Sequence, residues 1–310
     1  MMRISLCCLA AALAGAAAAA GAGGGAPTVA GCPAFPATSV WNTPVATLPV
    51  AADSAQLIAS IGLDSPLHPD FGSGLYDGSR IGIPYVVVHG RTTPKSRVRF
   101  DYADESDKGP YPIPANVPIE GDPHPGDGDR HALIVDRDSC RLYELYALHR
   151  TASGWAAGSG AIWSLRSNAL RPAGWTSADA AGLPIFPGLA RWDEAATGRI
   201  AHALRFTAPR TRSTYVYPAR HEASDSSDPS LPPMGLRVRL KASVGIARFP
   251  PQARVVLQAL KTYGMILADN GSPWFVSGAP DPHWSNDQLH ALTQLHGSDF
   301  EVVDTSRLRP

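Results

Sequence analysis

The segment from residue 126 to residue 150 constrains the fold most, because two stretches in it alternate apolar and polar residues around a short polar turn. The first stretch covers residues 131–135, the turn 136–139 and the second stretch 140–148. Period-two alternation around a turn predicts a β-hairpin. The arms carry titratable and aromatic side chains, namely His131, Tyr143, Glu144, Tyr146 and His149. Such residues on a largely apolar hairpin indicate the wall of a site.

Proline and glycine are abundant, with 29 of each among 310 residues. This composition favours many short strands joined by loops over a bundle of helices. Helical patterns are few, and the clearest are residues 53–61, 251–263 and 285–296. We therefore predict a mainly β fold, with a two-sheet sandwich or jelly-roll-like core and a few peripheral helices. The alternative is an α+β fold whose last third is semi-independent.

The N-terminal residues resemble an export signal. Arg3 supplies a positive charge, residues 5–20 form an apolar run, and small residues follow. We predict a signal peptide over residues 1–26 and a single β-rich domain over residues 27–310, secreted or periplasmic. The apolar run is short and rich in alanine, so we expect no stable membrane span.

Two cysteines remain after the predicted signal peptide, Cys32 and Cys140. Exported proteins meet an oxidising environment, so we predict a disulfide between them. The alternative is a lipoprotein anchored through Cys32, because the sequence Val29-Ala-Gly-Cys32 resembles a bacterial lipobox.

The charge of the chain excludes one class of partner. Lysine and arginine total 27, as do aspartate and glutamate, so the formal net charge is +0. A nucleic-acid-binding protein usually carries an excess of positive charge, and we expect no nucleic-acid partner. Acidic residues and histidines cluster just before the hairpin and at its first residue. They are Asp122, His124, Asp127, Asp129 and His131. Their spacing matches no known zinc or calcium loop, so we expect no metal and no cofactor.

Three residues are candidates for catalysis: Glu144, His202 and Asp269. Hydrolysis of a glycosidic bond needs two carboxyl groups, which Glu144 and Asp269 could supply, and His202 could orient one of them. Each residue also has a structural alternative. Glu144 could face solvent from its strand, Asp269 could serve a hairpin turn, and His202 could be a satisfied core histidine.

Further residues are candidates for substrate binding. Alternation over residues 236–241 puts Arg237 on one face with two other cations, which indicates either a groove for an anionic substrate or a solvated face. Sugar rings stack on aromatic side chains, although these also fill ordinary cores. The aromatic and histidine candidates are Tyr146, Tyr263, Trp163, Trp274 and His131.

Several strings together resemble a family of secreted bacterial proteins with no assigned activity. They are Leu142-Tyr-Glu-Leu-Tyr146, Ala180-Ala-Gly-Leu-Pro184 with Pro187-Gly-Leu189, Gly198-Arg-Ile-Ala-His-Ala-Leu204, Pro232-Pro-Met-Gly-Leu-Arg237, and Ala259-Leu-Lys-Thr-Tyr-Gly264 followed by Asp269. The resemblance covers nearly all of the chain after the predicted signal peptide. It implies export and one shared fold but no substrate. Within these strings it points to Glu144, His202, Arg237, Tyr263 and Asp269.

We predict a secreted carbohydrate-active enzyme, a glycoside hydrolase or a polysaccharide lyase, that acts on a polysaccharide as a monomer. In a lyase, His202, Tyr146 or Tyr263 would abstract the proton beside a uronate, and Arg237 would neutralise the carboxylate of that sugar. The alternative function is a non-catalytic protein that binds a glycan or the cell wall.

Overall fold

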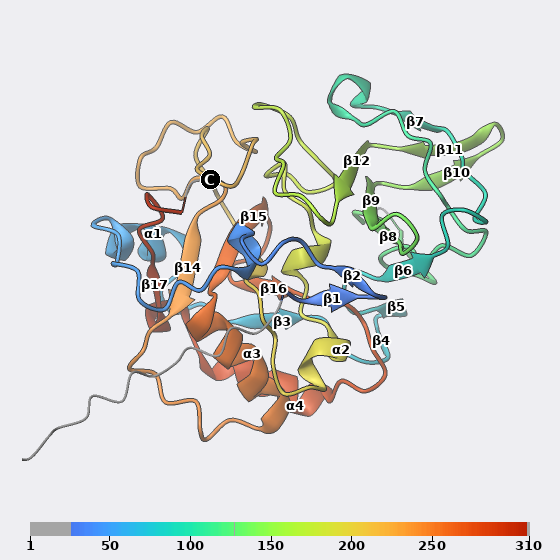
Figure 1. The fold of residues 1–310 in the computed structure, drawn as a ribbon. Coiled ribbons are helices and arrows are strands. Elements are labelled where there is room, and N and C mark those ends of the chain that lie inside the picture. The colour runs from blue at the N-terminus through green and yellow to red at the C-terminus, as the bar shows by residue number, and fades with distance from the viewer. Residues whose placement is uncertain (1–25, 127, 309–310) are drawn as a thin grey trace, which may run out of the picture.

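The computed structural model describes residues 26–126 and 128–308, and Figure 1 shows its fold. The predicted signal peptide, apart from residue 26, lies outside the described residues. Strands hold 26% of the residues and helices 16%, so the prediction of a mainly β chain with a few peripheral helices is confirmed. Two larger sheets dominate the structure, which is consistent with a β-sandwich.

The first of these sheets has four strands in the order β12-β9-β8-β6. Their bounds are β6 (Tyr85–Val88), β8 (Ala132–Asp136), β9 (Arg141–Tyr146) and β12 (Ser159–Ser164). Strands β8 and β9 form the predicted hairpin, with Leu133 opposite Glu144. Because side chains alternate along a strand, this register puts Glu144 and Tyr146 on the same face as Leu133, and His131 precedes β8 on that face too.

The second sheet has six strands in the order β17-β14-β15-β13-β16-β3. Their bounds are β3 (His68–Asp70), β13 (Leu204–Ala208), β14 (Arg237–Leu240), β15 (Met265–Asn270), β16 (Phe275–Ser277) and β17 (Phe300–Val302). In Figure 1 this sheet lies beside α3 and α4, and the four-stranded sheet, in green, lies on the other side of the molecule.

Smaller elements complete the fold. The short strands are β1 (Thr28–Val29) with β2 (Cys32–Pro33), β4 (Leu75–Tyr76) with β5 (Ser79–Arg80), and the sheet of β7 (Val98–Phe100), β10 (His149–Thr151) and β11 (Gly154–Ala157). The α-helices are α1 (Ser54–Ile61), α2 (Trp192–Ala195), α3 (Pro251–Thr262) and α4 (Asn286–His290). The 3-10 helices are η1 (Val40–Asn42), η2 (Ala103–Glu105), η3 (Phe186–Gly188), η4 (Ala291–Gln294) and η5 (Gly297–Asp299). Each helix is short, so tertiary packing rather than intrinsic propensity stabilises it.

Both faces of the four-stranded sheet are buried. Leu133 and Leu142 belong to a core cluster that includes Phe186 of η3. Ile134 and Tyr143, on the opposite face, belong to a separate cluster. The segment around η3 therefore covers the face of the hairpin that carries Glu144. The largest core cluster joins the six-stranded sheet to α1, α3 and α4.

Strand β14 differs from the expectation for residues 236–241. All four of its residues are buried, so Arg237 and Arg239 face neither solvent nor a groove. The Arg237 guanidinium donates to the carbonyls of Tyr263, Val40 and Thr43. Arg239 does the same for the carbonyls of two further residues between 40 and 48. The two arginines thus hold the N-terminal segment across the sheet.

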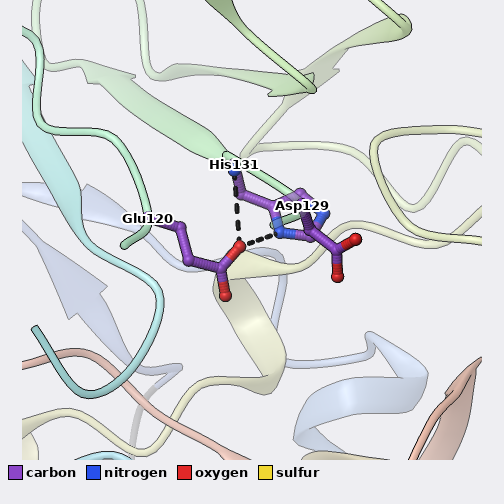
Figure 2. A group of neighbouring side chains, drawn as sticks. All are labelled: Glu120, Asp129 and His131. Carbon is purple, nitrogen blue, oxygen red and sulfur yellow. Dashed lines mark hydrogen bonds and ion pairs between the residues drawn. The ribbon is translucent and has the colours of Figure 1, made fainter. Parts of the chain in front are cut away.

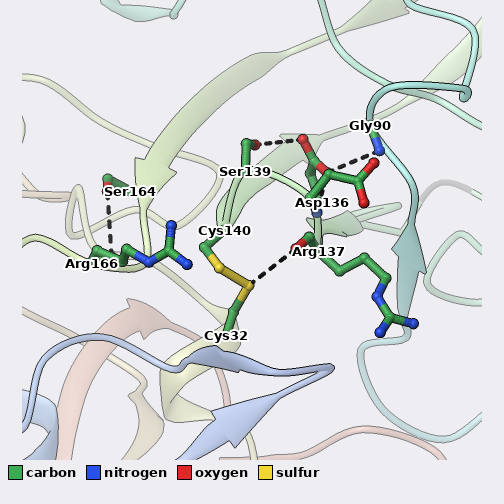
Figure 3. Close-up of a disulfide and its surroundings, with 9 residues drawn as sticks. Cys32, Gly90, Asp136, Arg137, Ser139, Cys140, Ser164 and Arg166 are labelled. Atoms are coloured by element: carbon green, nitrogen blue, oxygen red, sulfur yellow. Dashed lines mark hydrogen bonds between the residues drawn. A yellow bond between two sulfur atoms is a disulfide. The ribbon is translucent and has the colours of Figure 1, made fainter.

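The predicted disulfide between Cys32 and Cys140 is confirmed (Figure 3). It joins β2 to the turn of the β8–β9 hairpin, across a sequence separation of 108 residues. The Asp136 carboxylate supports this turn by accepting hydrogen bonds from Gly90, Asp138 and Ser139. With its sulfur in this bond, Cys32 has no free thiol for the lipid of a lipoprotein. No helix among residues 26–126 and 128–308 is long and apolar enough to cross a membrane.

We predict that removing the disulfide lowers the free energy of unfolding. The bond closes a long loop in the unfolded chain, so the Cys32→Ser, Cys140→Ser double variant should lose about 2–5 kcal/mol. Urea denaturation under oxidising conditions measures this difference. As a control, a reductant should destabilise the native protein but leave the double variant unchanged. Equal stability of the two proteins under oxidising conditions would contradict the prediction.

Candidate functional site

A cavity of about 350 Å³ lies where the ends of β9, β12 and β15 approach each other. The volume is within the range of about 300–1,000 Å³ that is usual for small-molecule sites. Its lining is mostly polar and acidic: Tyr102, Glu105, Asp129, Tyr146, Ser159, Thr176, Ser177, Ala178, Asp179, Ala180, His221, Asp269 and Asn270. Of the residues predicted as site residues, Asp269 and Tyr146 line this cavity.

Tyr146 reaches the cavity from the end of β9, where its ring packs closely against Gly158. A Cβ added to Gly158 would lie 2.6 Å from Cδ1 of the Tyr146 ring, so only glycine permits this approach. The ring also lies against His131, with 5.7 Å between ring centroids. The tyrosine is therefore fixed on two sides and half-buried.

Residues 176–180 line the cavity, and a buried ion pair holds them against the six-stranded sheet. Asp179 accepts from Nη2 of Arg205 at 2.7 Å and from its Nε at 3.2 Å, and the Asp179 side chain is fully buried. Arg205 comes from β13 and also donates to Ser277. Ser159 of β12 donates to the Ser177 carbonyl at 2.5 Å. These bonds hold the segment between the two sheets.

Asp269 reaches the cavity at a β-bulge. In the pairing of β13 with β15, Phe206 faces Leu267 and Thr207 faces Asp269, so Ala268 is the extra residue. A bulge redirects the side chains that follow it. The Asp269 side chain is 24% exposed, and one oxygen lies 3.6 Å from Nη2 of Arg205. Burial and the nearby charge of Asp179 outweigh Arg205 and raise the pKa of Asp269 to about 7.

His131 is bonded through both ring nitrogens, and Figure 2 shows its contact with Glu120. Nδ1 lies 2.5 Å from Oε2 of Glu120, and Nε2 lies 2.9 Å from the carbonyl oxygen of Ala178. Both partners are acceptors, so the geometry favours a doubly protonated ring. Burial opposes this charge, but Glu120 outweighs burial and raises the pKa of His131 to about 9. Reciprocally, His131 overcomes the effect of burial and lowers the pKa of Glu120.

Glu120, Asp129 and His131 could in principle hold a metal ion, because one ligand atom of each lies within 4.8 Å of the others. A metal ligand must be deprotonated. Here Nδ1 of His131 is bonded to Glu120, and Nε2 is bonded to Ala178. Glu120 and His131 are thus already paired with each other, and neither ring nitrogen is free to bind a metal ion. Asp127, from the acidic segment before the hairpin, lies outside the described residues.

Glu144 is fully buried and does not line the cavity. Its carboxylate accepts from the backbone N–H groups of Ile185 and Phe186, and from Nε1 of Trp163. Burial outweighs these bonds and raises the pKa of Glu144 to about 7. In this structure its contacts join β9 to η3 and β12, and the carboxylate has no exposed surface for a substrate.

His202 and Arg237 also lie apart from the cavity lining. His202 is buried, with Nε2 2.8 Å from Glu194 and Nδ1 2.7 Å from the Ala203 carbonyl. Arg237 is 2% exposed and bonds backbone carbonyls. The structure therefore does not bring Glu144, His202 and Asp269 together around one cavity.

The remaining aromatic candidates belong to the core. Trp163 is buried against Glu144, and Trp274 is fully buried with Nε1 donating to the Gly62 carbonyl. Tyr263 is buried, and its hydroxyl accepts from Arg199. None of the three lines the cavity.

Sequence reasoning missed much of the acidic group at the cavity. Asp179 and Arg205 each adjoin one of the strings at 180–184 and 198–204, but lie outside them. Asp129 stands in the acidic group whose spacing matches no metal loop, and Glu105 and Glu120 stand in a polar Pro/Gly-rich loop without periodicity. The one available signal was the number of acidic residues between 101 and 129.

Comparisons with known proteins add no identity. No protein-family model, no curated protein and no solved structure matches this chain.

We predict that Glu144 stabilises the fold. In Glu144→Ala, three buried donors lose their acceptor, and each such loss costs about 1–3 kcal/mol, so the free energy of unfolding should fall by at least about 3 kcal/mol. Urea denaturation at neutral pH measures this change. The control is Asp104→Ala, because Asp104 is exposed and should have little effect on stability. A Glu144 variant as stable as the control would show that the three bonds contribute nothing.

Proposed function

We propose that the protein is a secreted glycoside hydrolase that acts on a polysaccharide, with Asp269 as the general acid. The observation that carries the proposal is the pair of carboxyl groups in one cavity with unlike surroundings. Asp269 is largely buried, and its pKa is raised to about 7. Asp129 is exposed, in the loop before β8. Glycosidases separate their acid and base roles through such a difference in environment.

In the proposed reaction, Asp269 donates its proton to the glycosidic oxygen as the bond from that oxygen to the anomeric carbon breaks. Asp129 either accepts a proton from the water that attacks the anomeric carbon, or attacks that carbon itself and forms an ester. In the second route water then cleaves the ester, and the deprotonated Asp269 accepts the proton of this water. The stereochemistry of the product distinguishes the two routes, since the first inverts the anomeric centre and the second retains it. Tyr102, which is 55% exposed, and Tyr146 offer ring faces on which a sugar can stack.

Two observations favour a hydrolase over a lyase. Among the described residues that line the cavity there is no lysine or arginine that could neutralise a uronate carboxylate. Arg237, the residue expected to do so, is buried against backbone carbonyls. The disulfide supports the secreted or periplasmic location, because such bonds persist in oxidising compartments.

We expect Asp269→Asn and Asp129→Asn each to lower kcat/KM on a cleaved polysaccharide by at least about 100-fold. Both changes keep the size of the side chain but remove its proton transfer. Release of reducing ends measures the rate, and thermal unfolding checks that each variant is folded. Asp104→Asn is the matched control, since Asp104 is exposed and does not line the cavity. Full activity in either cavity variant would refute the assignment. Glycan binding without cleavage by the native protein would instead favour the non-catalytic alternative.

The rate should fall as pH rises through about 7, because Asp269 must be protonated to act as the acid. A plot of kcat/KM against pH measures this limb. Glu144 also has a pKa raised to about 7, so Glu144→Gln identifies which carboxyl is responsible. If the folded Glu144→Gln protein keeps the limb, the limb belongs to Asp269. If it loses the limb, the assignment to Asp269 is wrong.

A further inference from the structure

The charges around the cavity are strongly one-sided. Glu105, Asp129, Asp179 and Asp269 are all among the lining residues. Of the basic residue types, only His221 appears among the described lining residues. Two buried cations lie close by. Arg205 is bonded to Asp179 and lies 3.6 Å from Asp269, and Arg171 donates to the backbone carbonyls of Glu105 and Thr176. Asp179 is paired with Arg205, and Asp269 is protonated as the proposed general acid, so the negative charge that a substrate meets comes from Glu105 and Asp129.

The segment that carries Tyr102 and Glu105 is itself acidic. The segment 101–107 contains Asp101, Asp104, Glu105 and Asp107 and no basic residue. Asp101 and Asp104 are exposed, and Tyr102 and Glu105 of the same segment line the cavity. Arg171 offsets part of the charge at Asp107 through a 2.8 Å ion pair. Asp101 is likewise offset by Arg99, at 3.6 Å. Of the acids in this segment, Glu105 alone is among the described lining residues.

Glu105 is the acid best placed to contact a substrate without taking part in catalysis. Its Oε2 accepts from the backbone N–H of Thr176 at 2.9 Å, which orients the carboxylate at the cavity wall. The side chain is half-buried rather than covered. Among the described residues its carboxylate has no ion-pair partner within 4 Å, because Arg171, which donates to the Glu105 backbone carbonyl, is paired with Asp107. A cationic group of a ligand could bond this carboxylate directly.

We propose that the polysaccharide substrate carries free, protonated amino groups, as in a glucosamine polymer, and that Glu105 is a specificity-determining residue for the amine. This inference rests on the proposed hydrolase function and names its substrate class. Charge complementarity selects amino sugars over uronates, which the acidic lining repels, and over neutral or N-acetylated sugars, which gain nothing from the field.

The test compares glucosamine, N-acetylglucosamine, glucose and galacturonate oligomers of equal length at pH 6, with reducing-end release as the readout. We expect kcat/KM for the glucosamine oligomer to exceed that for each other oligomer by at least about tenfold, and its KM to rise with salt. Glu105→Gln should lower this preference about tenfold, because its amide oxygen can still accept from Thr176 but carries no charge. Asp104→Asn, the control, should change the preference by no more than about twofold.

The possible failures are distinguishable. Equal or faster cleavage of a neutral oligomer overturns the inference but leaves the hydrolase proposal intact. An unchanged preference in the folded Glu105→Gln variant removes Glu105 as the specificity residue. If no oligomer is cleaved, the hydrolase proposal fails. Calorimetric binding of the four oligomers then decides whether the cavity recognises amines, because equal affinity for all four overturns that recognition too.

Discussion

Buried carboxylates hold residues 176–190 between the two larger sheets, and the cavity depends on this arrangement. Glu144 of the four-stranded sheet accepts hydrogen bonds from the backbone N–H groups of Ile185 and Phe186. Asp179 of the segment itself binds Arg205 of the six-stranded sheet. Removing one partner of a buried ion pair leaves an uncompensated buried charge and destabilises the fold. The segment is thereby bound to both sheets, at places far apart in the sequence.

The same buried charges affect the pKa of Asp269 in the cavity. Asp179 must be buried to bind Arg205, and its charge contributes to the raised pKa of Asp269. His131, bonded to Glu120 and to the Ala178 carbonyl, adds a second buried ion pair beside the segment. The structural bonds that join the sheets therefore also create the unlike environments of the carboxyl groups in the cavity. This link explains why the pKa of Asp269 is raised at this place.

Local patterns predicted the β-rich class, the β8–β9 hairpin and the disulfide, because each depends on alternation, composition or cysteine count. Alternation also places Glu144 and Tyr146 on one face of β9. It could not show that this face is covered near Glu144 and open near Tyr146. That difference depends on η3, which lies about 40 residues further along the chain and packs on only one part of the hairpin.

The sequence by itself determined the β-rich class, the β8–β9 hairpin with its alternating side chains, and which two cysteines are available to pair. The tertiary structure decided which polar side chains reach a cavity. Arg237 alternates as a surface cation would, yet residues 40–48 cover it and their carbonyls bond it. Asp269 follows a turn-like pattern, yet a bulge opposite β13 directs it toward the cavity. The physical reason is that burial and charge environment arise from contacts between distant segments, which no local pattern contains.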